Sequence, residues 1–419
     1  MQSSNTLGVV ILLCVLSLTY NLSITTISII PSVLWKSHLE SHPHLYNASN
    51  NGITTIEGDM LQNIEDARKA FIATQGVKIS SIFICKMAVQ VVTDMFVGPL
   101  IHRIGYKVPM FAGTVVMTLS AIGFALAKSY PALFVSVAIQ GIGASCNVVG
   151  GMTMLVSTVT DKNQRRHVIR LSLSSILLRV AIVPWSEEIV GTFQDKIVKL
   201  CIVTALIALH GLFLLLFNIP KIERNEKAKQ PVALLPLLND NDFSRAGVIL
   251  VVIGLVLGTL TESCSVWSIS GVDLQWQTVL AIFSCGIALA IRLSIMSSRP
   301  RFPLRRWMGT ILGLFTATVG LTSFPLSLRL FSINSSTITL TIGFVSVATN
   351  IYPNLTSLAE ENHNSNYAAV YALADPILNF GVITGLLVTS GILPVTCIYP
   401  VLMLIMPCAY LLYVKFIYG

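Results

Sequence analysis

The sequence predicts an all-α membrane protein with twelve transmembrane helices arranged as two six-helix bundles. Of its 419 residues, 54% are hydrophobic and only 11% are charged, whereas soluble domains average about 25% charged residues. The apolar residues fall into runs of about 20 residues, the length that crosses the ~30 Å hydrocarbon core of a bilayer. Because the backbone finds no water there, we expect each run to be a helix. One long polar cytoplasmic break divides the runs six and six.

The expected spans divide the chain into two domains and a linker. Residues 1–219 form the N-terminal bundle, residues 220–245 the cytoplasmic linker and residues 246–419 the C-terminal bundle. A long polar loop at residues 36–76 separates the first two spans. The spans are expected at residues 7–35, 77–101, 108–127, 131–159, 168–190, 198–219, 246–268, 276–297, 307–327, 336–358, 366–390 and 393–417.

The loops carry an asymmetric charge that predicts the orientation in the membrane. Lysine and arginine gather in the loops after the second, fourth, sixth and eighth spans, whereas the loop after the tenth span, LAEENHNSN, has neither. By the positive-inside rule, the basic loops and both termini face the cytoplasm. Two glycosylation sequences, at Asn47 and Asn334, fall on the opposite side, so we expect both asparagines to be lumenal and glycosylated.

Several classes of function find no support in the sequence. It contains no phosphate-binding loop, no G-x-S-x-G and no H-E-x-x-H sequence, so we expect no enzyme activity. The eight cysteines include no C-x-x-C pair, and we expect neither a metal nor a cofactor. The net charge of +8 belongs to membrane loops, which indicates a lipid bilayer as partner and no nucleic acid. A monomer is favoured.

Residues 86–109, KMAVQVVTDMFVGPLIHRIGYKVP, place a lysine inside a span and a basic glycine-rich turn at its end. With LFVSVAIQGIGAS in the fourth span and SNYAAVYALAD in the eleventh, this stretch resembles the vesicular amine transporters of the major facilitator superfamily. The resemblance implies a proton-coupled antiporter that loads a small organic amine into vesicles by alternating access. Solute and protons would be its partners and a secretory vesicle membrane its location. The resemblance also implies a gating loop containing Gly98, Arg103, Gly105 and Lys107.

The sequence departs from the family at the acids that bind amines. Counting back from Pro31, Thr19 stands where the family has an aspartate, and Ala348 stands where it has a second one. Two alternatives therefore stay open. The chain is either a transport-deficient relative acting as a membrane binding or scaffold protein, or a transporter of a neutral or anionic solute.

Charged residues inside a membrane are costly and indicate function. Lys86 and Asp375 lie at comparable depth, and the resemblance implies that they form an ion pair used in proton coupling. Glu262, nearer the lumenal side, is expected to be either an accessory acid or a residue that reaches water at the lumenal end, and Arg179 is expected to be a helix contact. Asp94 is interpreted as a solvated acid near the end of its helix.

Uncharged polar side chains inside spans line a cavity or hydrogen-bond between helices. The candidate cavity residues are Thr19, Gln90, Asn147, Asn350, Tyr367, Tyr371 and Asn379. Pro353 and Pro376 are expected to break their helices and free backbone carbonyls for a ligand.

Overall fold

The computed structural model describes residues 58–127, 129–159, 161–174, 334–362 and 366–388, with scattered positions between 8 and 19, 202 and 211, and 237 and 258, and residues 313 and 316. In these parts of the chain, all regular structure is helical. Four described helical segments are long and apolar enough to cross a membrane: Ser80–Ile104, Lys107–Leu126, Tyr130–Thr158 and Tyr367–Leu387. They confirm the expected spans at residues 77–101, 108–127, 131–159 and 366–390.

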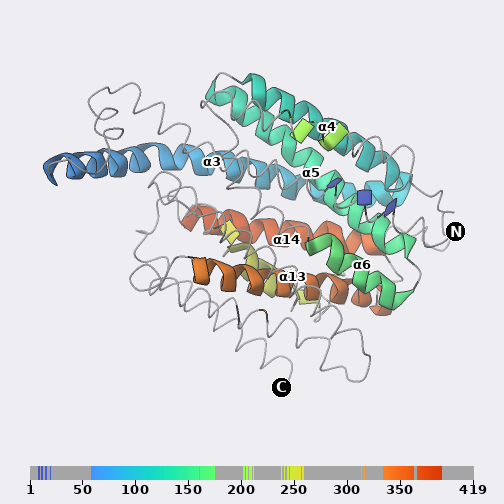
Figure 1. Cartoon of the computed structure of the whole chain (residues 1–419). Helices are drawn as coiled ribbons and strands as arrows, with labels where there is room; N and C mark the ends of the chain where they lie inside the picture. The colour runs from blue at the N-terminus through green and yellow to red at the C-terminus, as the bar shows by residue number, and fades with distance from the viewer. Residues whose placement is uncertain are drawn as a thin grey trace.

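Helix α3 runs from Gly58 to Ile104 and contains the first of these spans. Its 47 residues extend for about 70 Å at ~1.5 Å per residue, well beyond the ~30 Å core of a bilayer. Figure 1 shows its N-terminal part extending past the other helices. The expected polar loop at residues 36–76 is therefore wrong for its second half. Polarity made this stretch look like a loop, but it contains no proline to stop a helix.

A left-handed glycine ends α3. Gly105 has φ of +85°, and its N–H donates to the carbonyl of Ile101 at 2.8 Å. Glycine adopts this conformation without the steric cost that a Cβ would bring. His102 and Arg103 lie in the last turn, where positive charge complements the helix dipole. The sharp turn leads directly into the next helix.

Helices α4 (Lys107–Leu126) and α5 (Tyr130–Thr158) pack together through small residues. A Cβ on Gly113 would lie 2.5 Å from the Cβ of Cys146, and a Cβ on Gly143 would lie 2.7 Å from the carbonyl oxygen of Gly113. Such contacts let two backbones approach closely, as is common between membrane helices. Thr114 Oγ1 donates to Asn147 Oδ1 at 3.1 Å across the same contact.

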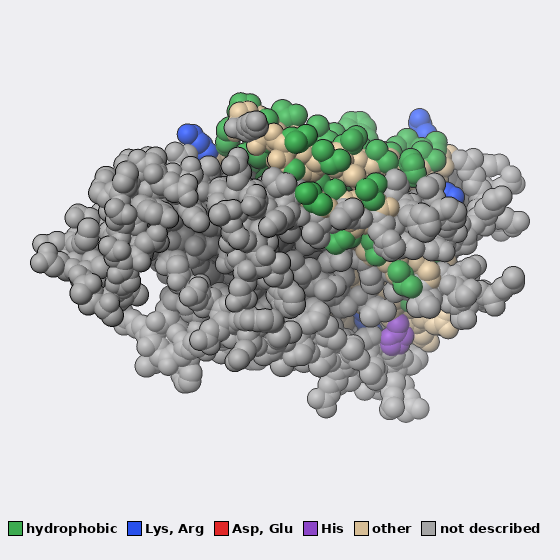
Figure 2. Space-filling view, turned by 45° about the horizontal axis from the view of Figure 1, so that its top comes forward, with side chains coloured by type: hydrophobic (Ala, Val, Ile, Leu, Met, Phe, Trp, Pro, Cys, Tyr) green, Lys and Arg blue, Asp and Glu red, His purple; other side chains and the backbone are tan. Residues whose placement is uncertain are grey.

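The outer face of this half is apolar. Figure 2 shows a continuous hydrophobic surface with basic side chains at its two ends. The exposed hydrophobic side chains of α3 and α4 include Val92, Phe96, Phe111, Leu119, Ile122 and Leu126. An apolar surface of this extent would be a liability in water, and we interpret it as the lipid-facing surface.

The C-terminal half contributes α13 (Asn334–Asn362) and α14 (Tyr367–Leu387), and α6 (Lys162–Ser174) lies beside α13. Helix α14 packs against α3 and α5 as well as α13 (Figure 1). Asn366 begins α14 by accepting a hydrogen bond from the N–H of Ala369 at 3.2 Å, an arrangement typical of N-caps. The two halves therefore meet along α3–α14 and along α6–α13.

Two expectations about the C-terminal half are wrong. Pro353 and Pro376 lie inside α13 and α14, which continue through them. A proline leaves the carbonyl four residues earlier without its helical donor, and for Pro353 this is Thr349, whose oxygen accepts from Arg170 Nε at 3.2 Å. The freed carbonyl is thus satisfied by a side chain of α6. Asn334 is the first residue of α13, not part of a loop.

Candidate functional site

The acid Asp375 lies at the contact between the two halves of the molecule. It belongs to α14 and is 6% exposed. Its Oδ2 accepts a hydrogen bond from Gln90 Nε2 of α3 at 2.7 Å and another from Asn379 Nδ2 at 3.2 Å. Asn379 lies one turn further along α14, so the two carboxamides bind the same oxygen from different helices. Two predicted cavity residues are thus placed beside the predicted acid.

Small residues bring these helices close enough for the contact. A Cβ on Gly98 would lie 2.6 Å from the Cβ of Ala372, so α3 and α14 touch at this point. On another side of α3, a Cβ on Gly141 would lie 2.6 Å from the carbonyl oxygen of Lys86. The polar residues of α3 are therefore enclosed by α14 and α5. Lys86, Gln90 and Asp94 are each 0% exposed.

Lys86 lies one helical turn before Gln90, on the side of α3 that faces these contacts. Among the described residues, the recorded ion pairs are those of Lys162 and Arg165 with Glu360, and none joins Lys86 to Asp375. In this conformation Asp375 is instead bound by two amides. The pairing of Lys86 with Asp375 stays a prediction. Lys86 lies one turn from Gln90, which donates a hydrogen bond to Asp375.

Asp94 is not the solvated helix-end acid that we expected. It is fully buried, and its Oδ1 accepts a hydrogen bond from Ser145 Oγ of α5. Its Oδ2 makes no hydrogen bond, although its carboxyl group interacts electrostatically with that of Asp375.

The spacing of residues along α3 could have revealed this buried position. Residues four apart on a helix share a face, and Lys86, Gln90, Asp94 and Gly98 are spaced by four. We define these buried polar groups, Lys86, Gln90, Asp94, Ser145, Asp375 and Asn379, as the acid cluster.

Three other predicted cavity residues make contacts elsewhere. Thr19 is buried, and its Oγ1 donates to the carbonyl of Val15 at 2.9 Å. Asn350 Nδ2 donates to the carbonyl of Ser346 at 2.6 Å. Asn147 bridges α5 and α4, where it accepts from Thr114. None of these contacts reaches Asp375, so the structure distributes the predicted set over several helix pairs.

A second contact joins the halves at one end of the bundle. Glu360 of α13 binds Arg165 and, at 3.2 Å, Lys162, both from α6. Arg165 Nη1 also donates to the hydroxyl of Tyr367 at 3.1 Å, and its guanidinium lies 5.6 Å from the centroid of that ring. Glu360 comes from the segment that lacks lysine and arginine, and its partners come from the segment that was expected to be a basic loop and forms the start of α6. We call Lys162, Arg165, Glu360 and Tyr367 the end contact.

The rest of α6 strengthens the end contact. Arg166 Nη2 donates to Ser357 Oγ at 3.2 Å, and Arg170 binds the carbonyl freed by Pro353. Burial and the neighbouring Arg170 lower the pKa of His167 below its ordinary value. His167 is therefore neutral at physiological pH, and the arginines and Lys162 supply the positive charge that faces α13.

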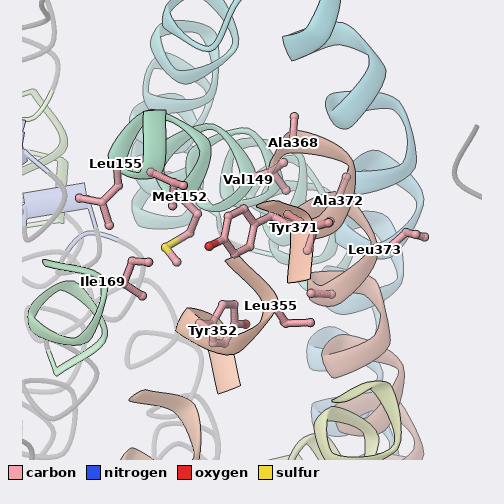
Figure 3. Close-up of a cluster of buried hydrophobic side chains, with 14 of the residues drawn as sticks. Val149, Met152, Leu155, Ile169, Tyr352, Leu355, Ala368, Tyr371, Ala372 and Leu373 are labelled. Carbon is pink, nitrogen blue, oxygen red and sulfur yellow. The ribbon is translucent and has the colours of Figure 1, made fainter. Parts of the chain in front are cut away.

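A buried hydrophobic layer lies next to the end contact. Figure 3 shows Tyr371 and Tyr352 among side chains of α5, α6, α13 and α14. The two tyrosine rings stack with centroids 6.2 Å apart, and the hydroxyl of Tyr371 hydrogen-bonds to Thr356 Oγ1. Tyr371 is 2% exposed. Tyr367 and Tyr371, predicted to line a cavity, thus make hydrogen-bond and packing contacts at one end of the bundle.

The remaining predicted residues divide into two groups. In the turn between α3 and α4, Arg103 and Lys107 are exposed and Gly105 has the left-handed backbone described above. Gly98 packs against α14. The gating role of this turn stays a prediction. Glu262, Arg179, Asn47 and the side chains of Asn334 and Ala348 lie outside the described residues.

Comparison with known proteins places this geometry in a transporter fold. The chain is 28% identical over 312 residues to the synaptic vesicular amine transporter of Homo sapiens, covering 74% of this chain and 60% of the relative. It is 28% identical over 350 residues to the chromaffin granule amine transporter of Rattus norvegicus, covering 83% and 66%. It is 24% identical over 311 residues to the vesicular acetylcholine transporter of Tetronarce californica, covering 72% and 59%. The chain thus matches less than two thirds of the length of these relatives.

Two solved structures share the fold over nearly the whole chain. The human organic anion transporter MFSD10 superposes with a TM-score of 0.70 at 13% identity, covering 97% of this chain and 99% of that protein. The proton:xylose symporter XylE superposes with a TM-score of 0.68 at 13% identity, covering 99% and 96%. The model of the Major Facilitator Superfamily matches residues 11–386. The chain is therefore an integral membrane protein that belongs to the Major Facilitator Superfamily, a family of carriers rather than enzymes.

Proposed function

We propose that this protein exchanges protons for a small organic, amine-like solute across a vesicle membrane by alternating access of its two halves. The observation that carries the proposal is the burial of Asp375 between α3 and α14, where a charge would otherwise be costly. An acid at the boundary of two moving halves can bind a proton in one arrangement and release it in another. The names of the similar proteins, which are vesicular amine and acetylcholine transporters, support the solute class and the vesicle membrane.

The end contact supports the alternating-access part of the proposal. It joins α6 of the N-terminal half to α13 of the C-terminal half through Arg165 and Glu360. Since the start of α6, which carries Arg165, is basic, the positive-inside rule favours a cytoplasmic position for this end, with both termini on that side and Asn47 in the lumen. The conformation would then be closed toward the cytoplasm. Breaking these ion pairs would let the halves open there.

The predicted pair of Lys86 and Asp375 fits this scheme if Asp375 exchanges one hydrogen-bond partner for another during the cycle. Asp375 is held by Gln90 in the present conformation, and Lys86 lies one turn away on the same helix. We propose that Lys86 binds the ionised Asp375 in another state of the cycle, because an isolated charge at this depth is unfavourable. Binding of a proton at the acid cluster would release the lysine and favour the amide contact. Glu262 is proposed as an accessory acid.

One observation favours a different solute or a role without transport. Thr19 is buried and bonds to its own helix, at the position where the resembling family has an aspartate. An ammonium group is stabilised in a buried site mainly by an opposite charge, and Thr19 offers none. The second candidate is therefore carriage of a neutral or anionic solute, or a binding or scaffold role in the membrane.

A solute panel in proteoliposomes distinguishes these functions. Purified protein would be reconstituted with an acidic interior, and uptake of radiolabelled cationic, neutral and anionic organic solutes would be measured with and without the pH gradient. We expect gradient-dependent accumulation of a cationic amine. Accumulation of a neutral or anionic solute alone would establish the second candidate, and binding of solutes without any uptake would establish a role without transport.

A further inference from the structure

We propose that Asp94 and Asp375 form one carboxyl pair that holds a single proton between the two halves of the transporter. The pair joins an acid of α3, in the N-terminal half, to an acid of α14, in the C-terminal half. The inference deepens the proposed function by naming a second acid of the proton site. The inference depends on the proposed function only in one respect, namely that binding and release of this proton drive transport.

The first support is the position of the two acids. Asp94 is 0% and Asp375 is 6% exposed. Gln90, one turn before Asp94, bonds to Asp375, and Gly98, one turn after Asp94, touches Ala372 of α14. Asp94 therefore lies between two points at which α3 contacts α14. Its carboxyl group interacts electrostatically with that of Asp375.

The second support is the distribution of hydrogen-bond donors. Ser145 donates to Asp94 Oδ1, and the amides of Gln90 and Asn379 donate to Asp375 Oδ2. Asp94 Oδ2 is buried and has no hydrogen-bond partner. An unpaired buried carboxylate oxygen is unfavourable, whereas a proton on Oδ2 turns it into a donor that can reach the carboxylate of Asp375. The three existing donors would remain in place.

The third support is the repulsion between two carboxylates. Among the described residues, Lys86 of α3 belongs to the acid cluster two turns before Asp94, and Cys146 of α5 and Asp375 of α14 interact with Asp94. Two carboxylates that share a low-dielectric site do not ionise together, because each repels the charge of the other. One proton shared between the two acids is therefore favoured.

The position of the pair explains how a proton and a conformation would be linked. The two acids sit on helices of different halves, so a movement that separates α3 from α14 also separates the carboxyl groups. The proton is then bound more tightly in the arrangement in which the acids meet. By thermodynamic reciprocity, the proton stabilises that arrangement to the same extent. Loss of the proton leaves two repelling carboxylates and favours separation of the halves.

Infrared spectroscopy of the full chain in proteoliposomes tests the pair without any solute or gradient. A protonated carboxylic acid has a C=O stretching band that ionised carboxylates lack, and the band shifts in D₂O. At neutral pH we expect one such band in the wild type and its loss in both Asp94→Asn and Asp375→Asn. Each substitution leaves one carboxyl group with its hydrogen-bond donors and no second carboxylate to repel its charge, so no proton is retained. Asp94→Glu, which keeps the acid, and Asp161→Asn, which removes an exposed acid, should retain the band.

Three results would overturn the pair. Absence of the band in the wild type would mean that both acids are ionised. A band that survives both substitutions would place the proton on another group, and a band lost in only one of them would assign it to a single acid rather than to a shared site. Because the spectrum requires no transport, the pair can fail while solute uptake succeeds, and uptake can fail while the pair stands. The two proposals are thus tested separately.

Discussion

Replacement of Gly98 by alanine tests whether α3 and α14 touch as closely as the site requires. The new Cβ would lie 2.6 Å from the Cβ of Ala372, whereas carbon atoms in good contact are ~3.5–4.0 Å apart. The helices would have to separate by about 1 Å at this point, since a Cβ cannot move without its backbone. Overpacking of this kind typically costs about 1–3 kcal/mol. We expect Gly98→Ala to be destabilised accordingly.

The control is Gly247→Ala. A glycine in a helix is less favourable than alanine by about 1 kcal/mol, so both substitutions gain this amount. The added Cβ at residue 247 would meet its nearest atom, Ile377 Cδ1, at 3.7 Å, an ordinary contact. Thermal unfolding in detergent should therefore show Gly98→Ala to be less stable than Gly247→Ala by about 1–3 kcal/mol.

A compensating substitution makes the prediction stricter. Ala372→Gly removes the atom that would clash, and the next atom near the Cβ of residue 98 is the carbonyl oxygen of Ala368 at 3.4 Å. The double variant should be more stable than the sum of the single effects predicts. Equal stabilities of Gly98→Ala and Gly247→Ala, or strict additivity in the double variant, would refute the close contact of α3 with α14.

Three further predictions concern the charged and polar residues. Arg165→Gln and Glu360→Gln should show a coupling energy of about 0.5–3 kcal/mol in a thermal-stability double-mutant cycle, since each removes the partner of the other; additivity would show that the end contact contributes nothing. Lys86→Met should lower stability, by an amount of order 3–5 kcal/mol in soluble cases, because it removes the positive charge of the acid cluster, and adding Asp375→Asn should recover stability without restoring pH-driven uptake. Thr19→Asp should strengthen the binding of cationic amines, measured by displacement of a radiolabelled amine, and unchanged binding in a folded variant would remove Thr19 from the cavity.

The positions of the spans that the structure describes were largely predictable from the sequence, because hydrophobic length determines which segments can span a membrane. The described spans of α4, α5 and α14 follow the expected ranges within a few residues. The early start of α3 was not predictable in this way, since its first part is polar and lies beyond the expected apolar run. Depth in the membrane also identified Asp375 as a buried acid, but it gave no information on which helix faces it.

The partners of the acids depend on helix packing that a single sequence does not encode locally. Asp94 and Asp375 are separated by most of the chain, and their meeting depends on the small side chains of Gly98 and Ala372. The spacing by four of Lys86, Gln90 and Asp94 indicates that they share one polar face of α3. The depth of each residue in the membrane does not reveal this face. Glu360 could have been found from charge complementarity, because it lies in a segment without lysine or arginine and its partners lie in a basic one.

We propose that a proton gradient drives solute movement through the acid between the two halves. The most direct measurement is accumulation of the solute panel in acid-loaded proteoliposomes that contain either the wild type or Asp375→Asn, with and without an ionophore that collapses the gradient. We expect accumulation by the wild type that the ionophore abolishes, and no gradient-driven accumulation by Asp375→Asn. Accumulation that is independent of the gradient, or that is unchanged in Asp375→Asn, would contradict it.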